Sequence, residues 1–255
     1  KAIVVVHYAG YSEDIDKIAK LAKKKRITLI EDCAHSIFTK FKKKYLGTFG
    51  DLSTFSFHET KNLHCGTGGA LIINNKKFIE KANIIANKGT NRHLFNSKKV
   101  SKYSWVSLGS SYKINELSSF FLYNVIKDRN IIKKRRISAW NFYYKHLSKL
   151  DESKKIKLPK YNFNNNENAA HIFYFLVKRN FRSKLIRYLK SNKISATFHY
   201  IPLCSAPYFN KYAEKKNFTS ELISNEIIRL PIYPKLNEKQ QNYIITKIYN
   251  FFELN

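Results

Sequence analysis

Residues 2–32 read AIVVVHYAGYSEDIDKIAKLAKKKRITLIED, and their pattern decides the fold class. The apolar run Ala2–Val6 predicts a buried strand, and Ser12–Lys24 predicts an amphipathic helix. The next apolar run, Ile27–Ile30, predicts a second strand that leads to Asp32. A strand, a helix and a strand in this order indicate a parallel βαβ unit. The strand stops at Glu31 and Asp32, so two carboxylates stand at its carboxyl end, where open α/β sheets hold their ligands, and Asp32 is a candidate site residue.

The same alternation continues toward residue 90, and a long helical region follows it. Further strands are expected at Asp51–Phe57, Ala70–Ile73, His171–Val177 and Ile194–Phe198, and further helices at Lys76–Lys88, Ser183–Lys190 and Glu238–Phe252. The helical pattern from Ile114 to Leu150 predicts a helix pair that leaves one domain and enters another. We therefore expect an α/β domain with a mostly parallel sheet at residues 1–135, followed by a linking helix and a small α+β domain at residues 136–255.

The chain carries a large positive charge. Its 255 residues include 47 Lys and Arg against 18 Asp and Glu, a formal net charge of +29, and 44% of the residues are hydrophobic. This hydrophobic share is enough for a folded core, and the positive surplus favours a nucleic-acid partner because Lys and Arg neutralise phosphates. The cations are spread along the whole chain without a basic tail or a recognition motif. A basic nucleic-acid-binding protein is therefore the last of the alternatives.

Membrane, disulfide and metal classes have little support in the sequence. No apolar run approaches the roughly 18 residues that a membrane span requires. The 3 Cys are odd in number and have no C-x-x-C spacing, which indicates neither a disulfide framework nor a zinc site. His58 and His64 have a spacing that a metal could use, but no carboxylate or Cys set completes the site. We expect a cytoplasmic protein with no metal and no membrane partner.

The string FSFHETKN at residues 55–62, followed by CGTGGA at residues 65–70, carries the chemistry. A strand that ends on the hydroxyl of Ser56 and continues into a glycine-containing loop can seat a phosphate. The amine of Lys61 lies in that loop, and a lysine amine that is partly desolvated can form a Schiff base. The carboxylate of Asp32 could keep a pyridine nitrogen protonated, which makes pyridoxal phosphate an electron sink. Order and spacing, rather than any single residue, favour this site.

These motifs resemble the DegT/DnrJ/StrS sugar aminotransferases, which are fold type I pyridoxal-phosphate enzymes. The resemblance runs through essentially the whole chain and rests on several strings in the order of the family. They are HYAG at residues 7–10, SFHETKN at 56–62, KGTNR at 88–92, GSSY at 109–112 and FHYIPL at 198–203. The resemblance implies a fold type I large domain followed by a small α+β domain, with pyridoxal 5′-phosphate as the cofactor.

The resemblance also implies a role for each matching residue. Lys61 would bind the cofactor covalently and then move a proton, Asp32 would pair with the pyridine nitrogen, and Ser56 would bind the cofactor phosphate. His35 would lie beside the phenolic edge of the ring. Further candidates are Ser111, at the place where many relatives reach the phosphate of a partner subunit, and Arg92 and His199 on the substrate side.

The implied reaction passes an amino group from L-glutamate to dTDP-4-dehydro-6-deoxyglucose. The motifs are most similar to the family members that make dTDP-4-amino-4,6-dideoxygalactose for enterobacterial common antigen, a cell-surface polysaccharide. Relatives build each site across a dimer, so a homodimer is the expected assembly.

Two departures from the family pattern define the alternative. Thr67 stands where the family usually has Glu in the loop after the lysine. About the first third of the family's chain precedes the strand at Ala2–Val6, and the sequence contains no Met. We therefore expect a fragment, and the alternative is a truncated remnant that no longer catalyses the reaction.

Overall fold

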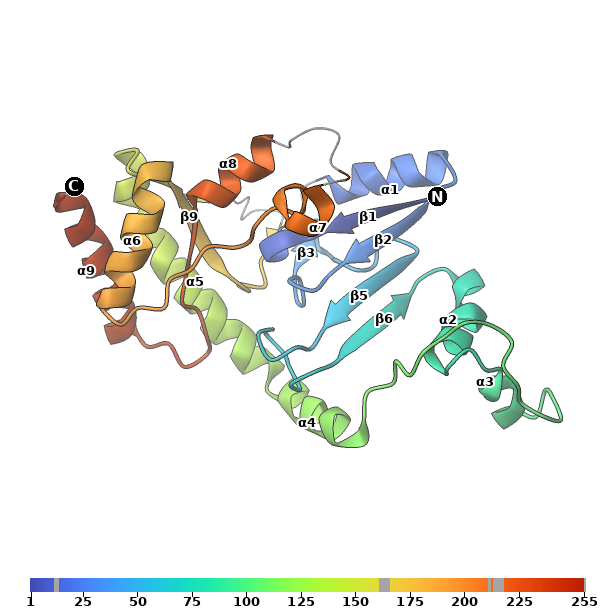
Figure 1. Ribbon diagram of the computed structural model, residues 1–255. Helices are drawn as coiled ribbons and strands as arrows, with labels where there is room; N and C mark the ends of the chain where they lie inside the picture. Colours follow the sequence, from blue (N-terminus) through green and yellow to red (C-terminus); the bar gives the residue numbers. More distant parts are fainter. Residues whose placement is uncertain (12–13, 161–165, 211, 213–217, 255) are drawn as a thin grey trace. The chain divides into compact units, whose positions relative to one another are not determined.

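The computed structural model describes residues 1–11, 14–160, 166–210, 212 and 218–254, which form two compact units (Figure 1). Unit 1 comprises Lys1–Asn130 and Asn164–Ala169, and unit 2 comprises Ile131–Phe163 and Ala170–Asn255. Within the described residues no helix has both the length and the apolar character that a bilayer crossing demands.

Unit 1 is built on a four-stranded sheet in the order β1-β2-β5-β6. Its strands are β1 (Ala2–Val6), β2 (Thr28–Asp32), β5 (Leu52–Ser56) and β6 (Gly69–Ile73). The first three strands run parallel, and β6 returns antiparallel to β5 (Figure 1). This mostly parallel sheet, whose first two strands are joined through helix α1 (Ile15–Lys24), confirms the expected α/β class.

Helix α1 (Ile15–Lys24) covers one face of this sheet. Its buried side chains, Ile15 and Ala22, pack in one cluster with Leu29 of β2 and with Cys33. The helix begins after Asp14, and the expected start at residues 12 and 13 lies outside the described residues. Cys33 is 1% exposed and Cys65 is 8% exposed, so both are buried thiols.

The opposite face of the sheet is open in unit 1. Paired residues of neighbouring strands share a face, and the register therefore places Val6, Asp32 and Thr54 together. Val4 and Val6 on this face are 61% and 58% exposed. This face therefore carries exposed valine side chains next to the polar side chains of Asp32 and Thr54 near the strand ends.

The remaining elements of unit 1 are short. Strands β3 (Lys40–Phe41), β4 (Lys44–Tyr45) and β8 (Asn166–Glu167) form a small second sheet. The helices are α2 (Ile79–Ala86), α3 (Arg92–Asn96) and α4 (Glu116–Lys127), and a 3-10 turn at Lys76–Phe78 precedes α2. Where one helix was expected at 76–88, the chain therefore forms two shorter pieces. No residue of α4 is buried.

Unit 2 packs helices against a three-stranded antiparallel sheet in the order β10-β9-β7. The strands are β7 (Ile156–Lys157), β9 (Phe173–Val177) and β10 (Ile227–Leu230). The helices are α5 (Arg129–Glu152), α6 (Arg179–Ser191), α7 (Pro207–Asn210), α8 (Phe218–Glu226) and α9 (Glu238–Glu253). Tyr143 of α5 is completely buried, and Trp140 is part of the same core.

The prediction of a strand at Ile194–Phe198 in unit 2 is wrong. Residues 194–198 form no strand and pair with β10 only through the isolated bridge between Thr197 and Arg229. The sequence reading missed β10, whose apolar residues Ile227 and Ile228 are buried, and the two-residue strands β3, β4, β7 and β8. A run of four residues is too short for periodicity to separate a strand from the end of a helix.

A buried carboxylate, that of Glu31, ties the parts of unit 1 together. Its oxygens accept hydrogen bonds from the backbone amides of Gly47 (2.8 Å), Phe49 (2.7 Å) and Gly50 (2.7 Å). The ring Nε2 of His7 lies 2.9 Å from the same carboxylate. Burial opposes ionisation of Glu31, but the hydrogen bonds from His7 and the amides outweigh it and lower the pKa below its ordinary value. Glu31 is therefore a charged anchor for β1, β2 and the loop at 47–50.

We predict that Glu31→Gln lowers the free energy of unfolding by about 3 kcal/mol, because the amide replaces a charge-assisted acceptor and points N–H groups at backbone donors. Urea unfolding followed by circular dichroism measures this. Glu80→Gln, an exposed change on α2, is the control and should shift stability by less than about 0.5 kcal/mol. Equal effects of the two changes would contradict the anchoring role.

The same carboxylate sets a pH dependence. Since the folded-state pKa of Glu31 is lowered, its contribution is present above the unfolded value of about 4.3 and is lost as pH falls through the folded pKa. The stability difference between the wild-type chain and Glu31→Gln should therefore shrink below about pH 4. Unfolding curves at several pH values check this, and a difference that stays constant down to the acid transition would refute it.

Candidate functional site

The carboxyl ends of β1, β2 and β5 meet at one edge of the sheet in unit 1. Asp32, at the end of β2, lies opposite Thr54 of β5, and Ser56 follows Thr54 on the same face. This is the open face, away from α1. The register thus brings a carboxylate and a hydroxyl to the position where open α/β sheets bind ligands.

The two oxygens of Asp32 have different surroundings. Oδ1 accepts a hydrogen bond of 3.0 Å from the backbone amide of Ala34, which fixes the orientation of the half-buried carboxylate. Among the residues that the structure describes, no hydrogen bond reaches Oδ2. Asp32 is therefore held in place with one oxygen that a ligand N–H could reach.

His35 lies in the loop after β2 and is oriented from the end of β1. The backbone amide of Ala9 is 3.3 Å from Nδ1 of His35, and the ring of Tyr8 meets the His35 ring edge-on at 5.5 Å between centroids. An amide N–H can only donate, so Nδ1 is the acceptor and the neutral ring carries its proton on Nε2. His35 is therefore a hydrogen-bond donor to groups on its Nε2 side.

Lys61 lies in the tight connection between β5 and β6. Its backbone amide donates to the carbonyl of His58 at 2.9 Å, and the amide of Cys65 donates to Phe57 at 2.9 Å. The next residue, Asn62, is buried and donates to the carbonyl of Ala169 at 2.7 Å. This bond fastens the loop of the half-buried Lys61 to a segment 107 residues away, and sequence reading gave no sign of it.

Glycines close this loop because side chains would not fit. A Cβ on Gly68 would lie 2.8 Å from Sγ of Cys65, and one on Gly69 would lie 2.9 Å from the carbonyl oxygen of Phe55. Real Cβ atoms do not approach other atoms this closely, so the backbone oxygen of Phe55 excludes a side chain at Gly69, and a side chain at Gly68 would have to displace that of Cys65.

The other candidates lie elsewhere. Ser111 is exposed and forms an isolated bridge with Asn87, and Arg92 is exposed at the start of α3. Within the described part of unit 1, neither makes a hydrogen bond or ion pair with the four residues at the sheet edge. His199 belongs to unit 2, is 7% exposed, and places Nε2 3.2 Å from Nη1 of Arg229.

A buried group of His7, Glu31 and Cys33 offers one ligand atom each within 4.8 Å of one another. Both oxygens of Glu31 are already occupied by hydrogen-bond donors. Burial raises the pKa of the Cys33 thiol to about 12, which keeps it protonated at neutral pH. His7, Glu31 and Cys33 therefore fit a structural hydrogen-bond network better than a metal site.

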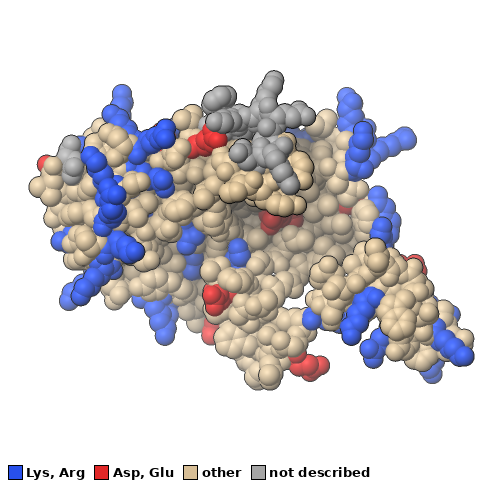
Figure 2. All heavy atoms as spheres, in the orientation of Figure 1, with Lys and Arg blue, Asp and Glu red and all other residues tan. Residues whose placement is uncertain are grey.

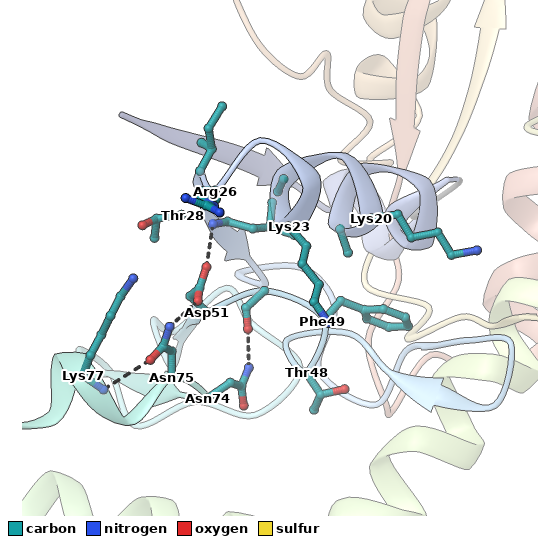
Figure 3. Close-up of a pocket in the computed structure, with 15 residues that line it drawn as sticks. Lys20, Lys23, Arg26, Thr28, Thr48, Phe49, Asp51, Asn74, Asn75 and Lys77 are labelled. Atoms are coloured by element: carbon teal, nitrogen blue, oxygen red, sulfur yellow. Dashed lines mark hydrogen bonds between the residues drawn. The ribbon is translucent and has the colours of Figure 1, made fainter.

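A basic cavity of about 610 Å³ lies at the other edge of the sheet. It is lined by the end of α1 and by the segments around Thr48–Asp51 and Asn74–Lys77 (Figure 3). Its cations are Lys20, Lys23, Arg26 and Lys77. The side chain of Asn75 donates a hydrogen bond to Asp51, and these two side chains accept hydrogen bonds from the backbone amides of Lys77 and Leu29, respectively (Figure 3). These bonds fix the wall of the cavity. The cavity adjoins the amino ends of β2 and β5, so it is separate from the site at their carboxyl ends.

Known proteins are similar to this chain over nearly its whole length. The model of the DegT/DnrJ/EryC1/StrS aminotransferase family matches residues 1–249. A UDP-4-amino-4,6-dideoxy-N-acetyl-β-L-altrosamine transaminase of Campylobacter jejuni is 27% identical over 99% of this chain and 66% of its own length. A dTDP-3-amino-3,6-dideoxy-α-D-galactopyranose transaminase of Aneurinibacillus thermoaerophilus is 28% identical over 97% of this chain and 64% of its own length. The chain thus spans a little less than two thirds of these relatives.

Solved structures share the fold. The aminotransferase TlmJ of Streptoalloteichus hindustanus superposes with a TM-score of 0.89 at 22% identity, over 100% of this chain and 66% of its own. The sugar aminotransferase Spr1654 of Streptococcus pneumoniae, in its PLP-form, gives 0.85 at 20% identity, over 99% of this chain and 68% of its own. The chain therefore belongs to the DegT/DnrJ/EryC1/StrS aminotransferase family, whose members depend on pyridoxal phosphate.

Proposed function

We propose that this chain carries the cofactor-binding core of a pyridoxal-phosphate-dependent nucleotide-sugar aminotransferase. The observation that supports the proposal is the donor and acceptor set at one sheet edge. Asp32 offers a carboxylate oxygen, His35 offers an Nε2 proton, and Ser56 offers a hydroxyl. Lys61 follows in the loop of the same strand. This set fits a ligand with a ring N–H, a phenolic oxygen and a phosphate.

Pyridoxal phosphate, when bound, acts as an electron sink that makes the C–H bond beside the amino nitrogen acidic. Asp32 would hold the ring nitrogen in its protonated form through Oδ2, and Ser56 would donate its hydroxyl proton to the phosphate. His35 would donate from Nε2 to the phenolic oxygen. The amine of Lys61 would first hold the cofactor and then take and return a proton at the substrate carbon.

For the substrates we propose L-glutamate as the amino donor and dTDP-4-dehydro-6-deoxyglucose as the acceptor. The names of the two transaminases above support a nucleotide-linked 6-deoxy amino sugar, with the amino group at carbon 4 in one and at carbon 3 in the other. The dTDP nucleotide, amination at carbon 4 and a role in enterobacterial common antigen follow from the motif resemblance alone.

A second copy of this chain is the proposed partner. α4 presents Leu117 at 85% exposure and Phe120 at 69% exposure, and its apolar side chains have no buried position in unit 1. The segment before α4 adds the exposed rings of Trp105 and Tyr112. Several large apolar side chains exposed on one helix and the segment before it are typical of a protein interface. Basic side chains, by contrast, are scattered over the face shown in Figure 2, which does not favour a nucleic-acid surface.

We predict that incubation with pyridoxal phosphate and reduction with borohydride attaches the cofactor to Lys61, because this half-buried lysine lies in the loop that follows the strand of Ser56. Peptide mass mapping locates the label. Lys61→Ala should lose it, and Lys43→Ala, an exposed control, should keep it. A folded sample without label at residue 61 would favour the non-catalytic remnant, and an absorbance band of the bound cofactor that survives Lys61→Ala would contradict the assignment.

We predict that the wild-type chain sediments as a dimer and that Phe120→Glu sediments as a monomer with an unchanged circular dichroism spectrum. The introduced carboxylate would be buried in the dimer and exposed in the monomer, so the substitution weakens dimerisation and leaves the fold of the monomer unchanged. Ser119→Glu, also exposed on α4, is the matched control and should stay dimeric. A monomeric wild-type chain, or a dimeric Phe120→Glu, would remove this interface.

A further inference from the structure

Residues 166–169 join unit 1 from a distant part of the sequence, and the proposed mechanism does not use them. We call them the bridging segment. Its strand β8 pairs antiparallel with β3, so that Glu167 lies opposite Lys40 and Asn166 opposite Phe41. Nζ of Lys40 lies 2.9 Å from Oε1 of Glu167, an ion pair between residues 127 positions apart. The bridging segment is therefore fixed on unit 1 by backbone and side-chain contacts.

Ala169, the last residue of the bridging segment, bonds in two directions. Its carbonyl accepts a hydrogen bond of 2.7 Å from Nδ2 of Asn62, and its amide donates one of 3.1 Å to Oγ1 of Thr39. Ala169 is fully buried, and Asn62 and Thr39 are 5% and 3% exposed. Hydrogen bonds shielded from water are electrostatically stronger than exposed ones. These two bonds therefore hold Asn62 and Thr39 firmly to one residue.

The two residues bonded to Ala169 belong to loops that carry candidate site residues. One of them is the neighbour of Lys61 in the loop after β5. The other, Thr39, closes the loop after β2, because its amide donates to the carbonyl of Ser36 at 2.9 Å and Ser36 follows His35. Ala169 therefore connects the loop of Lys61 to the loop of His35.

The turn after β1 packs at the same place. A Cβ on Gly10 would lie 3.2 Å from both the carbonyl oxygen of His35 and Oγ1 of Thr39. The same Cβ would lie 3.0 Å from Oδ1 of Asn168 in the bridging segment. The φ of Gly10 is +80°, which L side chains rarely adopt, so glycine allows this close approach. The bridging segment thus borders the loops that follow all three parallel strands.

We propose that Asn62, held by Ala169, is a positioning residue for Lys61. The amine of a lysine lies at the end of a flexible four-carbon stem, so its place depends on a fixed backbone. The bond from the amide of Lys61 to His58 shapes the turn locally, whereas the bond from Asn62 ties the turn to the rest of unit 1. This inference rests on the proposed function, in which the amine of Lys61 holds the cofactor.

Timed borohydride trapping of pyridoxal phosphate on Lys61 tests the proposal. Asn62→Ala removes the donor, and Thr39→Val removes the hydroxyl that accepts from Ala169. Each variant should slow the labelling of Lys61 at least about tenfold, because a misplacement of about 1 Å can cost about a hundredfold in rate. Thr39→Ser keeps the hydroxyl and should label at close to the wild-type rate. The control Asn96→Ala, an exposed change at the end of α3, should leave the rate unchanged.

Urea unfolding of the same variants separates positioning from stability. A merely structural bond would lower the unfolding midpoint of Asn62→Ala and leave its labelling rate at the wild-type value, and that result would overturn the proposal. Equal slowing in Thr39→Ser and Thr39→Val would also contradict it, since the hydroxyl would then have no part. If Asn62→Ala does not fold, the comparison of the two Thr39 variants carries the same test from the other end of the bridge.

Amide hydrogen exchange without pyridoxal phosphate distinguishes this inference from the proposed function. The amides of Lys61 and Cys65, which close the loop after β5, should exchange at least about tenfold faster in Asn62→Ala. The amide of Ile30 in the middle of the sheet should keep its wild-type rate. A wild-type chain that is never labelled at Lys61 would count against the proposed function. Unchanged exchange at Lys61 and Cys65 would count against the positioning role alone.

Discussion

The carboxylate of Glu31 has no access to water, and four hydrogen-bond donors from two segments, the end of β1 and the loop at 47–50, converge on it. Because a buried charge is costly unless its lone pairs are filled, the amides of Gly47, Phe49 and Gly50 and the ring of His7 are held to it together. Asp32 follows Glu31 in the same strand, with its side chain on the other face. The anchor thus sets the backbone from which the site carboxylate projects, and it does so from the covered side of the sheet.

The two faces of the sheet in unit 1 carry different kinds of side chain. One face packs on α1 and holds the apolar core with Glu31 among it. The other carries Asp32, Thr54 and Ser56 beside exposed valines. Alternation along each strand therefore separates stabilising groups from ligand-binding groups by a single residue step, so a shift in register would exchange them. The paired parallel strands β1, β2 and β5 prevent such a shift.

Local pattern was enough for the βαβ start and for the position of Lys61, because apolar periodicity and glycine spacing lie within short stretches of sequence. The partners of Glu31 and Asn62 could not be read in this way. Three of the Glu31 partners are backbone amides, which leave no residue-type signal, and the Asn62 bond joins residues 107 positions apart. The same limit explains residues 194–198, where one bridge at Thr197 replaced the expected strand.

α4 has consequences for the thermodynamics of folding. A helix of 12 residues with no buried side chain gains little from packing, such as the contact of Phe121 with His64, and relies mainly on its own backbone hydrogen bonds and on the cap from Asn115 to the amide of Ser118. Isolated helices of about this length are marginal in water. Its helix–coil equilibrium should therefore be linked to whatever covers Leu117 and Phe120, so that ordering of the helix and association become one cooperative event. Amide exchange in α4 would then depend on protein concentration, whereas exchange in the sheet core would not.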